Sequence, residues 1–494
     1  MLLLGLDIGS SSVKAAVLAG ESGRVLASAF YPPHELAIQA PRPGWAEQDP
    51  TTWWDCVKTA TQAVLNQAEV KAEAVGAIGI SYQMHGLVVL DENHDVLRPS
   101  IIWCDSRAVE TGQRAFEAMG AERALSHLLN SPGNFTASKL RWVRENEPDV
   151  YRRIRHIMLP GDYIALRLTG EIHTTISGLS EGIFWDFKDN RLSDLVLEQY
   201  DIDPALIPDT VPTFAEQGRL QAGAAQALGL PAGIPVSYRA GDQPNNALSL
   251  NVLRPGDIAA TAGTSGVVYG VSEEVRYDPA SRVNTFAHVN HGADTRLGIL
   301  LCVNGTGILN SWLKHQVGGS LDYPAMNTAA EAVPIGSDGL LVMPFGNGAE
   351  RVLENRDPGA SVHGLQFNRH GQGHLFRAAQ EGIVFALYYG MEIMADMGIS
   401  PQVIRAGQAN MFLSPIFRET LASLSGAPIE LYNTDGAQGA ARGAGLGVGY
   451  YRSFEEAFRS LRVLQRVEPD LTRQAAYQAA YGRWRQQLLG LLAS

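Results

Sequence analysis

Short apolar runs alternate with amphipathic stretches along the whole chain. Leu2–Asp7 and Val13–Ala19 have the pattern of paired strands. Two further strands are predicted at Ala77–Tyr82 and Leu87–Leu90, on either side of the turn at Gln83–Gly86. One predicted helix begins at Pro50, where the apolar positions take helical spacing. The same spacing predicts four more helices, at Ser106–Ala118, Ala137–Asn146, His374–Met397 and Thr472–Leu492. This alternation predicts an α/β protein in which helices cover the sheets.

Two strand–turn–strand segments resemble each other at a separation of roughly half the chain. LLGLDIGSSSVKAAVL begins near the N-terminus and IAATAGTSGVVYGV begins at Ile258, so that Gly9-Ser10-Ser11 aligns with Gly263-Thr264-Ser265. Two unrelated hairpins explain the match, because Gly-Ser turns are common, and the short match alone favours them. A duplicated fold explains it as well, and would place two glycine-hydroxyl turns on opposite sides of a cleft.

Composition limits the classes of function. The 494 residues are enough for two or three domains, and 51 acidic against 39 basic residues give a net charge of -12. This charge disfavours binding to nucleic acid or to an anionic membrane surface. No apolar stretch approaches the roughly 20 residues that span a bilayer, and the N-terminal run lacks a basic segment before it. Cys56, Cys104 and Cys302 lie far apart, which predicts neither a zinc site nor a disulfide framework, and we expect a cytoplasmic protein.

The two glycine-hydroxyl turns carry the groups that bind phosphate. Such sites need backbone N–H groups and hydroxyls close together, and Gly9–Ser12 and Gly263–Ser265 supply both. No lysine follows a glycine, so the P-loop motif is absent. The glycines of Gly443–Gly449 lack dinucleotide-binding spacing and instead predict a helix face of small residues that permits close packing.

Asp7 and Asp242 each follow an apolar run and stand beside glycine. An acid in this position is usually a turn former or a helix cap. Two such acids can instead share Mg²⁺ through its water ligands, and one of them can accept a proton from an attacking hydroxyl. The local pattern leaves both interpretations open.

Three turns carry side chains suited to small-molecule ligands. Gln83-Met84-His85-Gly86 separates two strands, and Trp103-Cys104-Asp105 combines an aromatic ring with an acid, a pair that can hold a sugar. Taken alone, His85 is equally well a core or turn histidine. Arg405–Asn410 follows a strand and offers either a flat backbone and an amide to a nucleotide base or a simple strand-to-helix turn.

Together these segments resemble the FGGY family of carbohydrate kinases, and within it the xylulokinases, from about Leu4 to Tyr450. DIGSSSVK and TAGTSG resemble the two phosphate motifs. GISYQMHGLVVLD followed by VLRPSIIWCDSRA resembles the pentulose-binding side and is the most specific part of the likeness. AGDQPNNA resembles the segment of the catalytic Asp, although the usual GGGD is RAGD here, and the usual GGGA of the adenosine motif is RAGQA.

The resemblance implies a fold of duplicated actin-like ATPase domains, which are ribonuclease H-like, on both sides of a central cleft. It divides the chain into a sugar-binding domain at 1–247, an ATP-binding domain at 248–450 and a helical tail at 451–494 packed on the core. The implied activity is ATP-dependent phosphorylation of D-xylulose, in a protein that can form a homodimer. Two alternatives stay open: a kinase for another sugar or polyol, of the ribulose, gluconate or glycerol type, and a non-catalytic nucleotide-dependent sensor.

The resemblance also implies roles for individual residues. Asp242 is the catalytic residue, and Asp7 with Asp242 holds Mg²⁺. The sugar contacts are Gln83, Met84, His85, Trp103, Asp105 and Asp242. The ATP contacts are Gly9, Ser10, Ser11, Ser12, Gly263, Thr264, Ser265, Gly307, Gly407, Gln408 and Asn410.

Overall fold

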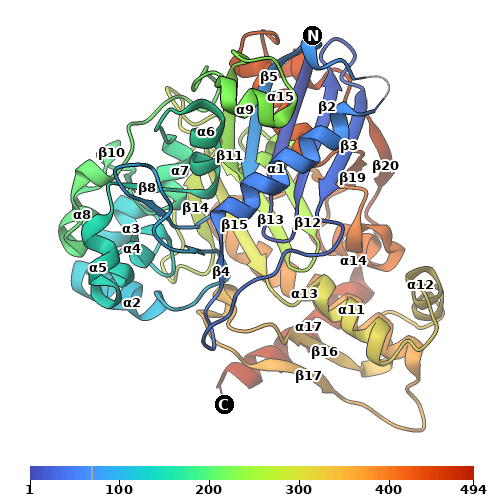
Figure 1. Ribbon diagram of the computed structural model, residues 1–494. Helices are drawn as coiled ribbons and strands as arrows, with labels where there is room; N and C mark the ends of the chain where they lie inside the picture. The colour runs from blue at the N-terminus through green and yellow to red at the C-terminus, as the bar shows by residue number, and fades with distance from the viewer. Residues whose placement is uncertain (68–69, 494) are drawn as a thin grey trace.

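The computed structural model describes residues 1–67 and 70–493 (Figure 1). Residues 68–69 of the predicted first domain and Ser494 of the predicted tail lie outside the described residues. Two mixed sheets with helices packed on them form the body of the molecule, which confirms the predicted α/β class.

The first sheet has the strand order β11-β5-β1-β2-β3. These strands are β1 (Leu2–Ile8), β2 (Val13–Ala19), β3 (Val25–Tyr31), β5 (Val75–Tyr82) and β11 (Val236–Gly241). β2 is antiparallel to β1 and to β3, whereas β1, β5 and β11 are parallel to one another. The carboxyl ends of these three parallel strands therefore meet at one edge of the sheet.

The second sheet has the order β14-β15-β13-β12-β18-β19-β20. Its strands are β12 (Ile258–Ala262), β13 (Gly266–Ser272), β14 (Asn284–Ala287), β15 (Leu297–Val303), β18 (Ile404–Gly407), β19 (Ile429–Tyr432) and β20 (Val463–Val467). The five strands β15-β13-β12-β18-β19 repeat the order and directions of β3-β2-β1-β5-β11. The two similar hairpins are thus equivalent parts of a duplicated fold, and the interpretation as unrelated hairpins is wrong.

Both faces of the first sheet are covered by helices. α1 (Pro50–Leu65) packs on β2 and β3 and crosses in front of them in Figure 1. The sequence starts this helix at Pro50, and the Asp49 side chain caps it by accepting from the Thr51 N–H.

The other face is covered by α15 (Gly436–Gly447), a helix from the second half of the chain. A Cβ on Gly5 would lie 1.8 Å from the Ala437 carbonyl oxygen, and one on Gly447 would lie 1.8 Å from that of Ser237. Backbone approaches this close require glycine on both the strand and the helix. The predicted small-residue helix face is therefore confirmed.

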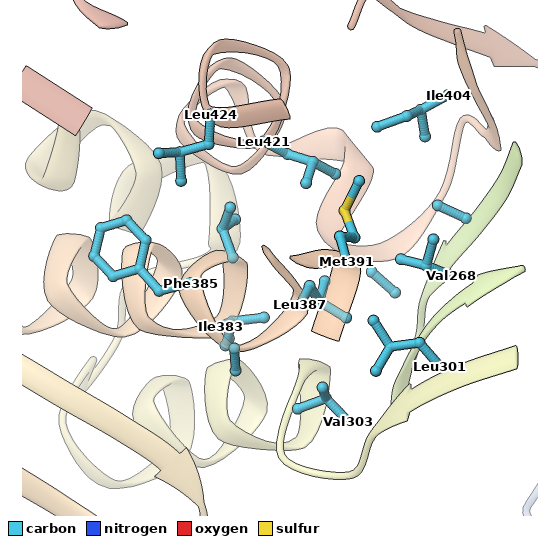
Figure 2. Packing of buried hydrophobic residues seen from close by; sticks show 14 of the residues in the cluster. Val268, Leu301, Val303, Ile383, Phe385, Leu387, Met391, Ile404, Leu421 and Leu424 are labelled. Carbon is cyan, nitrogen blue, oxygen red and sulfur yellow. The ribbon is translucent and has the colours of Figure 1, made fainter. Parts of the chain in front are cut away.

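The core of the second domain lies between its sheet and α13 (Gln372–Asp396) (Figure 2). Val268 and Leu301 from the strands meet Leu387 of α13, and Leu421 and Leu424 of α14 (Pro415–Ser425) close the cluster from a further side. Burying such a set of aliphatic side chains is the main favourable contribution to folding.

The segment after residue 450 differs in part from the predicted helical tail. It holds α16 (Phe454–Phe458), the strand β20 and α17 (Gln474–Ala493). α17 packs on the core through Trp484, but β20 adds a strand to the second sheet beside β19. The side chains of β20 are largely exposed on both faces, so no apolar alternation marked it as a strand.

Two of the remaining helices, α2 (Val109–Met119) and α4 (Thr136–Asn146), lie within a few residues of predicted stretches. The others were not predicted individually: α3 (Ala121–Leu128), α5 (Pro148–Arg153), α6 (Pro160–Thr169), α7 (Ile176–Glu181), α8 (Asp194–Tyr200), α9 (Ala222–Leu228), α10 (Asp242–Ser249), α11 (Gly307–Gln316) and α12 (Tyr323–Glu331). The predicted division at 247/248 falls inside α10.

Four small two-stranded sheets complete the fold. They pair β4 (Glu47–Gln48) with β7 (Ser100–Ile101), β6 (Val88–Leu90) with β8 (His156–Met158), β9 (Trp185–Asp186) with β10 (Arg191–Leu192), and β16 (Leu341–Phe345) with β17 (Gly359–His363). Among the described helices, none is both long enough and apolar enough to cross a membrane.

Candidate active site

The carboxyl edge of the first sheet gathers the acids and the sugar-side turn. Asp7 stands at the end of β1 opposite Ser81 of β5, and Gln83–His85 follow β5 directly. Gly241 ends β11 opposite Tyr82, so Asp242 begins α10 at the same edge. Ligands of open α/β sheets bind beyond the carboxyl ends of the strands. The fold therefore brings together residues that are more than 230 positions apart.

Asp7 is half-buried between two strands and the start of α15. Its Oδ1 accepts a 2.7 Å hydrogen bond from the Ser81 hydroxyl. Its Oδ2 faces Gly436, where a Cβ would lie 2.3 Å away. Burial raises the pKa of the Asp7 carboxyl, and the negative charge of Asp435, the residue that caps α15, raises it further.

Asp242 is also half-buried, and burial together with the charge of Asp7 raises its pKa to about 7. A carboxyl with this pKa is poised to accept a proton near neutral pH. Among the described residues, no lysine or arginine forms a salt bridge with Asp7 or Asp242. Two adjacent carboxylates without a cationic partner fit Mg²⁺ held partly through water.

The first phosphate turn projects beyond the β1–β2 hairpin. Two carbonyl oxygens of this turn already accept hydrogen bonds from the protein. The Leu36 N–H donates to the Ser11 carbonyl at 2.7 Å, and the Gln48 side chain donates to the Ser10 carbonyl at 2.7 Å. Among the described residues, no protein acceptor takes the N–H groups of Ser10, Ser11 or Ser12. Those N–H groups and the serine hydroxyls therefore remain for an anion.

The second phosphate turn gathers residues from three elements of the second domain. The Gly307 N–H, at the start of α11, donates to the Gly263 carbonyl at 2.9 Å. Asn410 lies at the start of the 3-10 helix η5 (Asn410–Leu413), and its Nδ2 would be 3.6 Å from a Cβ on Gly263. Thr264 is exposed beside them. The structure thus groups Gly263, Thr264, Ser265, Gly307 and Asn410 as predicted.

Gly407 and Gln408 reach the same edge of the second sheet from β18. Gly407 is the last residue of that strand and stands opposite Tyr432 of β19. The Gln408 N–H donates to the Tyr432 carbonyl at 2.9 Å and its side chain is exposed. Gln408 comes directly after β18, just as Gln83 comes directly after β5 in the first sheet.

The two domains meet beside the site. Burial, and after it the charges of Glu350 and of Asp242 in the first domain, raises the pKa of the Cys302 thiol on β15 to about 12. Arg351 of the second domain lies 5.4 Å from the Phe135 ring centroid, and that ring meets the His85 imidazole edge-on at 4.9 Å. The two sides of the site therefore face each other.

The sugar-side turn fixes the tautomer of His85. Its Nδ1 lies 2.9 Å from the Glu181 carbonyl oxygen, which can only accept, so Nδ1 carries a proton. Burial lowers the pKa of His85 to about 3, so the ring is neutral and Nε2 is an acceptor. Such a nitrogen can accept a hydrogen bond from a ligand hydroxyl. The left-handed φ of 62° at His85 turns the chain at this point.

The neighbours of His85 in the turn are buried. Met84 packs on Gly241, where a Cβ would lie 2.6 Å from its Cγ. Gln83 Oε1 is buried and has no hydrogen-bond partner among the described residues, while Gln83 Nε2 contacts Gln48 Oε1 at 3.4 Å. An unsatisfied buried amide oxygen next to a cleft is a site at which a ligand donor compensates the cost of burial.

Trp103 and Asp105 have different surroundings. The Trp103 side chain is 44% exposed, and its Nε1 donates to Ser10 Oγ at 3.3 Å, which places the ring beside the first phosphate turn. Asp105 is buried and its oxygens accept from the Ala46 N–H at 2.6 Å and from several N–H groups of Arg107. We therefore correct the predicted direct sugar contact of Asp105: its acceptor capacity is used inside the protein.

Sequence reasoning missed residues that hold the site in place. Gln48 bonds both Gln83 and Ser10, and thus connects the sugar-side turn to the first phosphate turn. Lys139 donates to the carbonyls of His85 and Ile102 at 2.8 and 3.0 Å, and burial lowers its pKa to about 7. Nothing in the local sequence separates such a lysine from an exposed one, since its partners are backbone atoms far along the chain.

Comparison with known proteins agrees with this arrangement. The model of the N-terminal domain of the FGGY family of carbohydrate kinases matches residues 2–249, and that of the C-terminal domain matches residues 258–447. A xylulose kinase of Escherichia coli (strain K12) is 32% identical over 505 residues, which cover 100% of both chains. A xylulose kinase of Bacillus subtilis (strain 168) is 30% identical over 469 residues, 92% of this chain and 90% of the relative.

Solved structures show the same likeness in three dimensions. The crystal structure of xylulose kinase from Rhodospirillum rubrum superposes with a TM-score of 0.88 at 27% identity and covers 99% of each chain. Together with the repeated strand order, the phosphate turns and the paired acids, these matches show that the chain belongs to the FGGY family of carbohydrate kinases.

Proposed function

We propose that this protein transfers the γ-phosphoryl group of ATP to the 5-hydroxyl of D-xylulose, forming D-xylulose 5-phosphate and ADP. The observation that carries the proposal is the position of Asp242, an acid with a pKa of about 7 between the sugar-side turn and the two phosphate turns. The full-length similarity to xylulose kinases supports D-xylulose as the sugar.

The first domain binds the sugar in this proposal. Gln83 and His85 offer an amide oxygen and Nε2 to sugar hydroxyls, Met84 forms an apolar floor on Gly241, and Trp103 packs on a C–H face. Asp242 takes the reacting hydroxyl. Asp105 contributes by holding Arg107 and the backbone of Ala46 rather than by touching the sugar.

ATP binds mainly to the second domain. The N–H groups and hydroxyls of Gly9–Ser12 and Gly263–Ser265 flank the β- and γ-phosphates from opposite sides. Gly307, Gly407, Gln408 and Asn410 form the wall for the nucleoside. Asp7 and Asp242 would hold Mg²⁺ through its waters, and the ion would supply neutralisation of the phosphate charge.

The chemistry needs positioning more than a strong base. The O5–P bond forms as the bond between the γ-phosphorus and its bridging oxygen to the β-phosphate breaks, and ADP leaves with that oxygen. The proton of the O5 hydroxyl moves to the Asp242 carboxylate late in this step, because the free alcohol is hardly acidic. Cleft residues from both domains exclude water, which would otherwise compete with the sugar.

Turnover of Asp242→Asn tests the proposal. The variant keeps the shape and the hydrogen-bonding capacity of the side chain but cannot accept the proton. We expect kcat to fall by at least about 1,000-fold while the KM for ATP changes by less than about threefold. Coupled detection of ADP with D-xylulose measures both parameters, and Asp278→Asn, which removes an acid that pairs with Arg282 in the loop between β13 and β14, is the control expected to keep wild-type kinetics.

A panel of D-xylulose, D-ribulose, gluconate and glycerol in the same assay tests the substrate. The proposal expects the highest kcat/KM with D-xylulose. A higher value for another compound would reassign the substrate, a response that is flat across the panel would identify a sensor, and near-normal turnover by Asp242→Asn would reject the assigned base.

We further propose a cytoplasmic location and a homodimer. The thiols Cys56, Cys104 and Cys302 are free, as suits a reducing compartment that also supplies ATP. Sedimentation velocity of the purified protein measures the assembly.

A further inference from the structure

Glu181 ends α7 directly beneath the catalytic edge, although no motif pointed to it. Its side chain is 2% exposed, and a Cβ on Gly241 would lie 2.7 Å from Glu181 Oε2. Gly241 immediately precedes Asp242 and also packs on Met84. The carboxyl group of Glu181 therefore lies against the backbone that carries the proposed base.

The same residue supports the sugar-side turn through its main chain. The Glu181 carbonyl accepts the Nδ1 proton of His85 at 2.9 Å. Glu181 thus packs with its side chain against Gly241, the residue before Asp242, and holds His85 through its carbonyl.

Among the residues that the structure describes, no lysine, arginine or histidine forms a salt bridge with the Glu181 carboxyl. Both carboxyl oxygens are buried, and neither has a hydrogen-bond partner of good geometry among the described residues, although the Tyr82 hydroxyl lies close by. Arg239, the one arginine in this cluster, is 1% exposed and pairs with Asp162 at 3.1 Å. Lys139 already donates to two carbonyls.

Burial raises the pKa of the Glu181 carboxyl well above its usual range. The charges of Asp242 and Asp162 raise this pKa further, whereas the Tyr82 hydroxyl and the charge of Lys139 lower it. The position of the side chain against Gly241 is set by packing and does not depend on which of these effects prevails.

We infer that Glu181 is a positioning residue for phosphoryl transfer, whose buried side chain packs against Gly241 and thereby holds Asp242 in place from beneath the sugar-binding floor. The inference rests on the proposed function, because it gives Asp242 the role of base. A displacement of about 1 Å at a reacting group is enough to lower a rate by about 100-fold. Glu181 itself touches neither substrate.

Two substitutions test the contact with Gly241. Glu181→Gln keeps the volume of the side chain, and we expect its kcat and sugar KM to stay within about threefold of wild type. Glu181→Ala leaves a void under Gly241 and Met84, and we expect kcat to fall by about 10- to 100-fold with a raised sugar KM and an unchanged KM for ATP. Both variants keep the main-chain carbonyl that bonds His85, so the difference reports the side chain.

The matched control is Glu381→Gln. Glu381 is an equally buried glutamate, but it pairs with Arg377 on α13, in the core of the second domain. The control should lower Tm and leave kcat and both KM values unchanged. This result would show that a loss of stability alone does not lower kcat and raise the sugar KM while the KM for ATP stays the same. Glu181→Thr replaces Glu181→Ala if the alanine variant does not fold, because threonine leaves a smaller void but still withdraws the end of the side chain from Gly241.

The outcomes are distinct. A kcat for Glu181→Gln as low as that for Glu181→Ala would mean that side-chain volume is not what supports Gly241, and wild-type kcat in Glu181→Ala or Glu181→Thr would mean that the side chain positions nothing; either result overturns the inference. Failure of the proposed function shows instead in the wild type, as absent turnover of D-xylulose. In that case the comparison is made with the sugar that the wild type phosphorylates.

Discussion

At the scale of single residues, the burial of Asp242 explains its affinity for a proton. The carboxyl lies at a strand end where the neighbouring Asp7 charge and the loss of water both penalise ionisation, and its pKa is about 7. The acid is therefore close to half-ionised at neutral pH, which is the condition under which a general base combines availability with basicity.

The pH dependence of catalysis follows from this value. Below about pH 7 the carboxyl is protonated, so we expect kcat/KM for the sugar to fall about tenfold per pH unit and to reach a plateau above pH 7. Initial rates between about pH 5 and 9, at saturating ATP and Mg²⁺, measure the profile. A flat profile across this range would contradict the role of Asp242.

Stability should show the opposite trend, which provides a check without turnover. Because the folded-state pKa of Asp242 is raised above 3.8, the ordinary value of an aspartate, ionisation costs folded stability as the pH rises from about 4 to 7. Asp242→Asn removes that cost. Its Tm should exceed that of the wild type at pH 8, and the gain should shrink toward zero near pH 4.

The role of a site residue could be predicted from sequence where a local motif forms the site. It could not be predicted where the role depends on contacts with residues distant in the chain. Asp7, the two phosphate turns and Asp242 stand at strand ends that an apolar pattern reveals. Asp105 accepts from the Ala46 N–H, 59 positions earlier, but also from Arg107, only two positions later, so that the Asp-x-Arg spacing is a local signal of this pairing. Glu181 and Lys139 gain their roles from contacts that no local pattern encodes.

At the scale of elements, the packing of α15 depends on glycines in a different part of the chain. Gly5 of β1 lies under Ala437, and Gly79 of β5 would place a Cβ 2.0 Å from the Ala440 carbonyl. The glycine run of α15 predicted close packing, but the sequence could not tell which sheet it would cover. β20 shows the complementary limit, since its exposed side chains carry no strand pattern.

Alanine substitutions at two glycines test this packing. Gly5→Ala places its Cβ 1.8 Å from a backbone oxygen, so the helix must shift, and we expect a loss of about 3 kcal/mol in the free energy of unfolding. Gly482→Ala, in α17 with no atom within 4 Å, should instead gain about 0.5–1 kcal/mol from helix propensity. Thermal and urea unfolding measure both, and equal effects would contradict the packing.

At the scale of the whole molecule, the two halves exchange structure instead of standing side by side. The first sheet is built from residues before 242, yet one of its faces is covered by α15 at 436–447. The boundary predicted at 247/248 divides the chain into two halves, but in space α15 of the second half is part of the packing of the first sheet.

This arrangement predicts that residues 1–247 cannot fold alone. Without α15, the strand face around Gly5 and Gly79 exposes buried apolar surface and has no partner. We expect the fragment to be aggregated or to lack a cooperative unfolding transition in circular dichroism. A soluble fragment with a sharp transition would show that α15 is dispensable for the first sheet.

The contact between α15 and the first sheet also constrains recombination between relatives. A chimera joined near residue 250 takes its first sheet from one parent and α15 from the other. Positions 5 and 79 of the first parent must then fit positions 437 and 440 of the second, and positions 237 and 238 must fit positions 447 and 443. Parents that differ in bulk at any of these positions will give chimeras that fail at a surface distant in sequence from the junction, even when each half is intact.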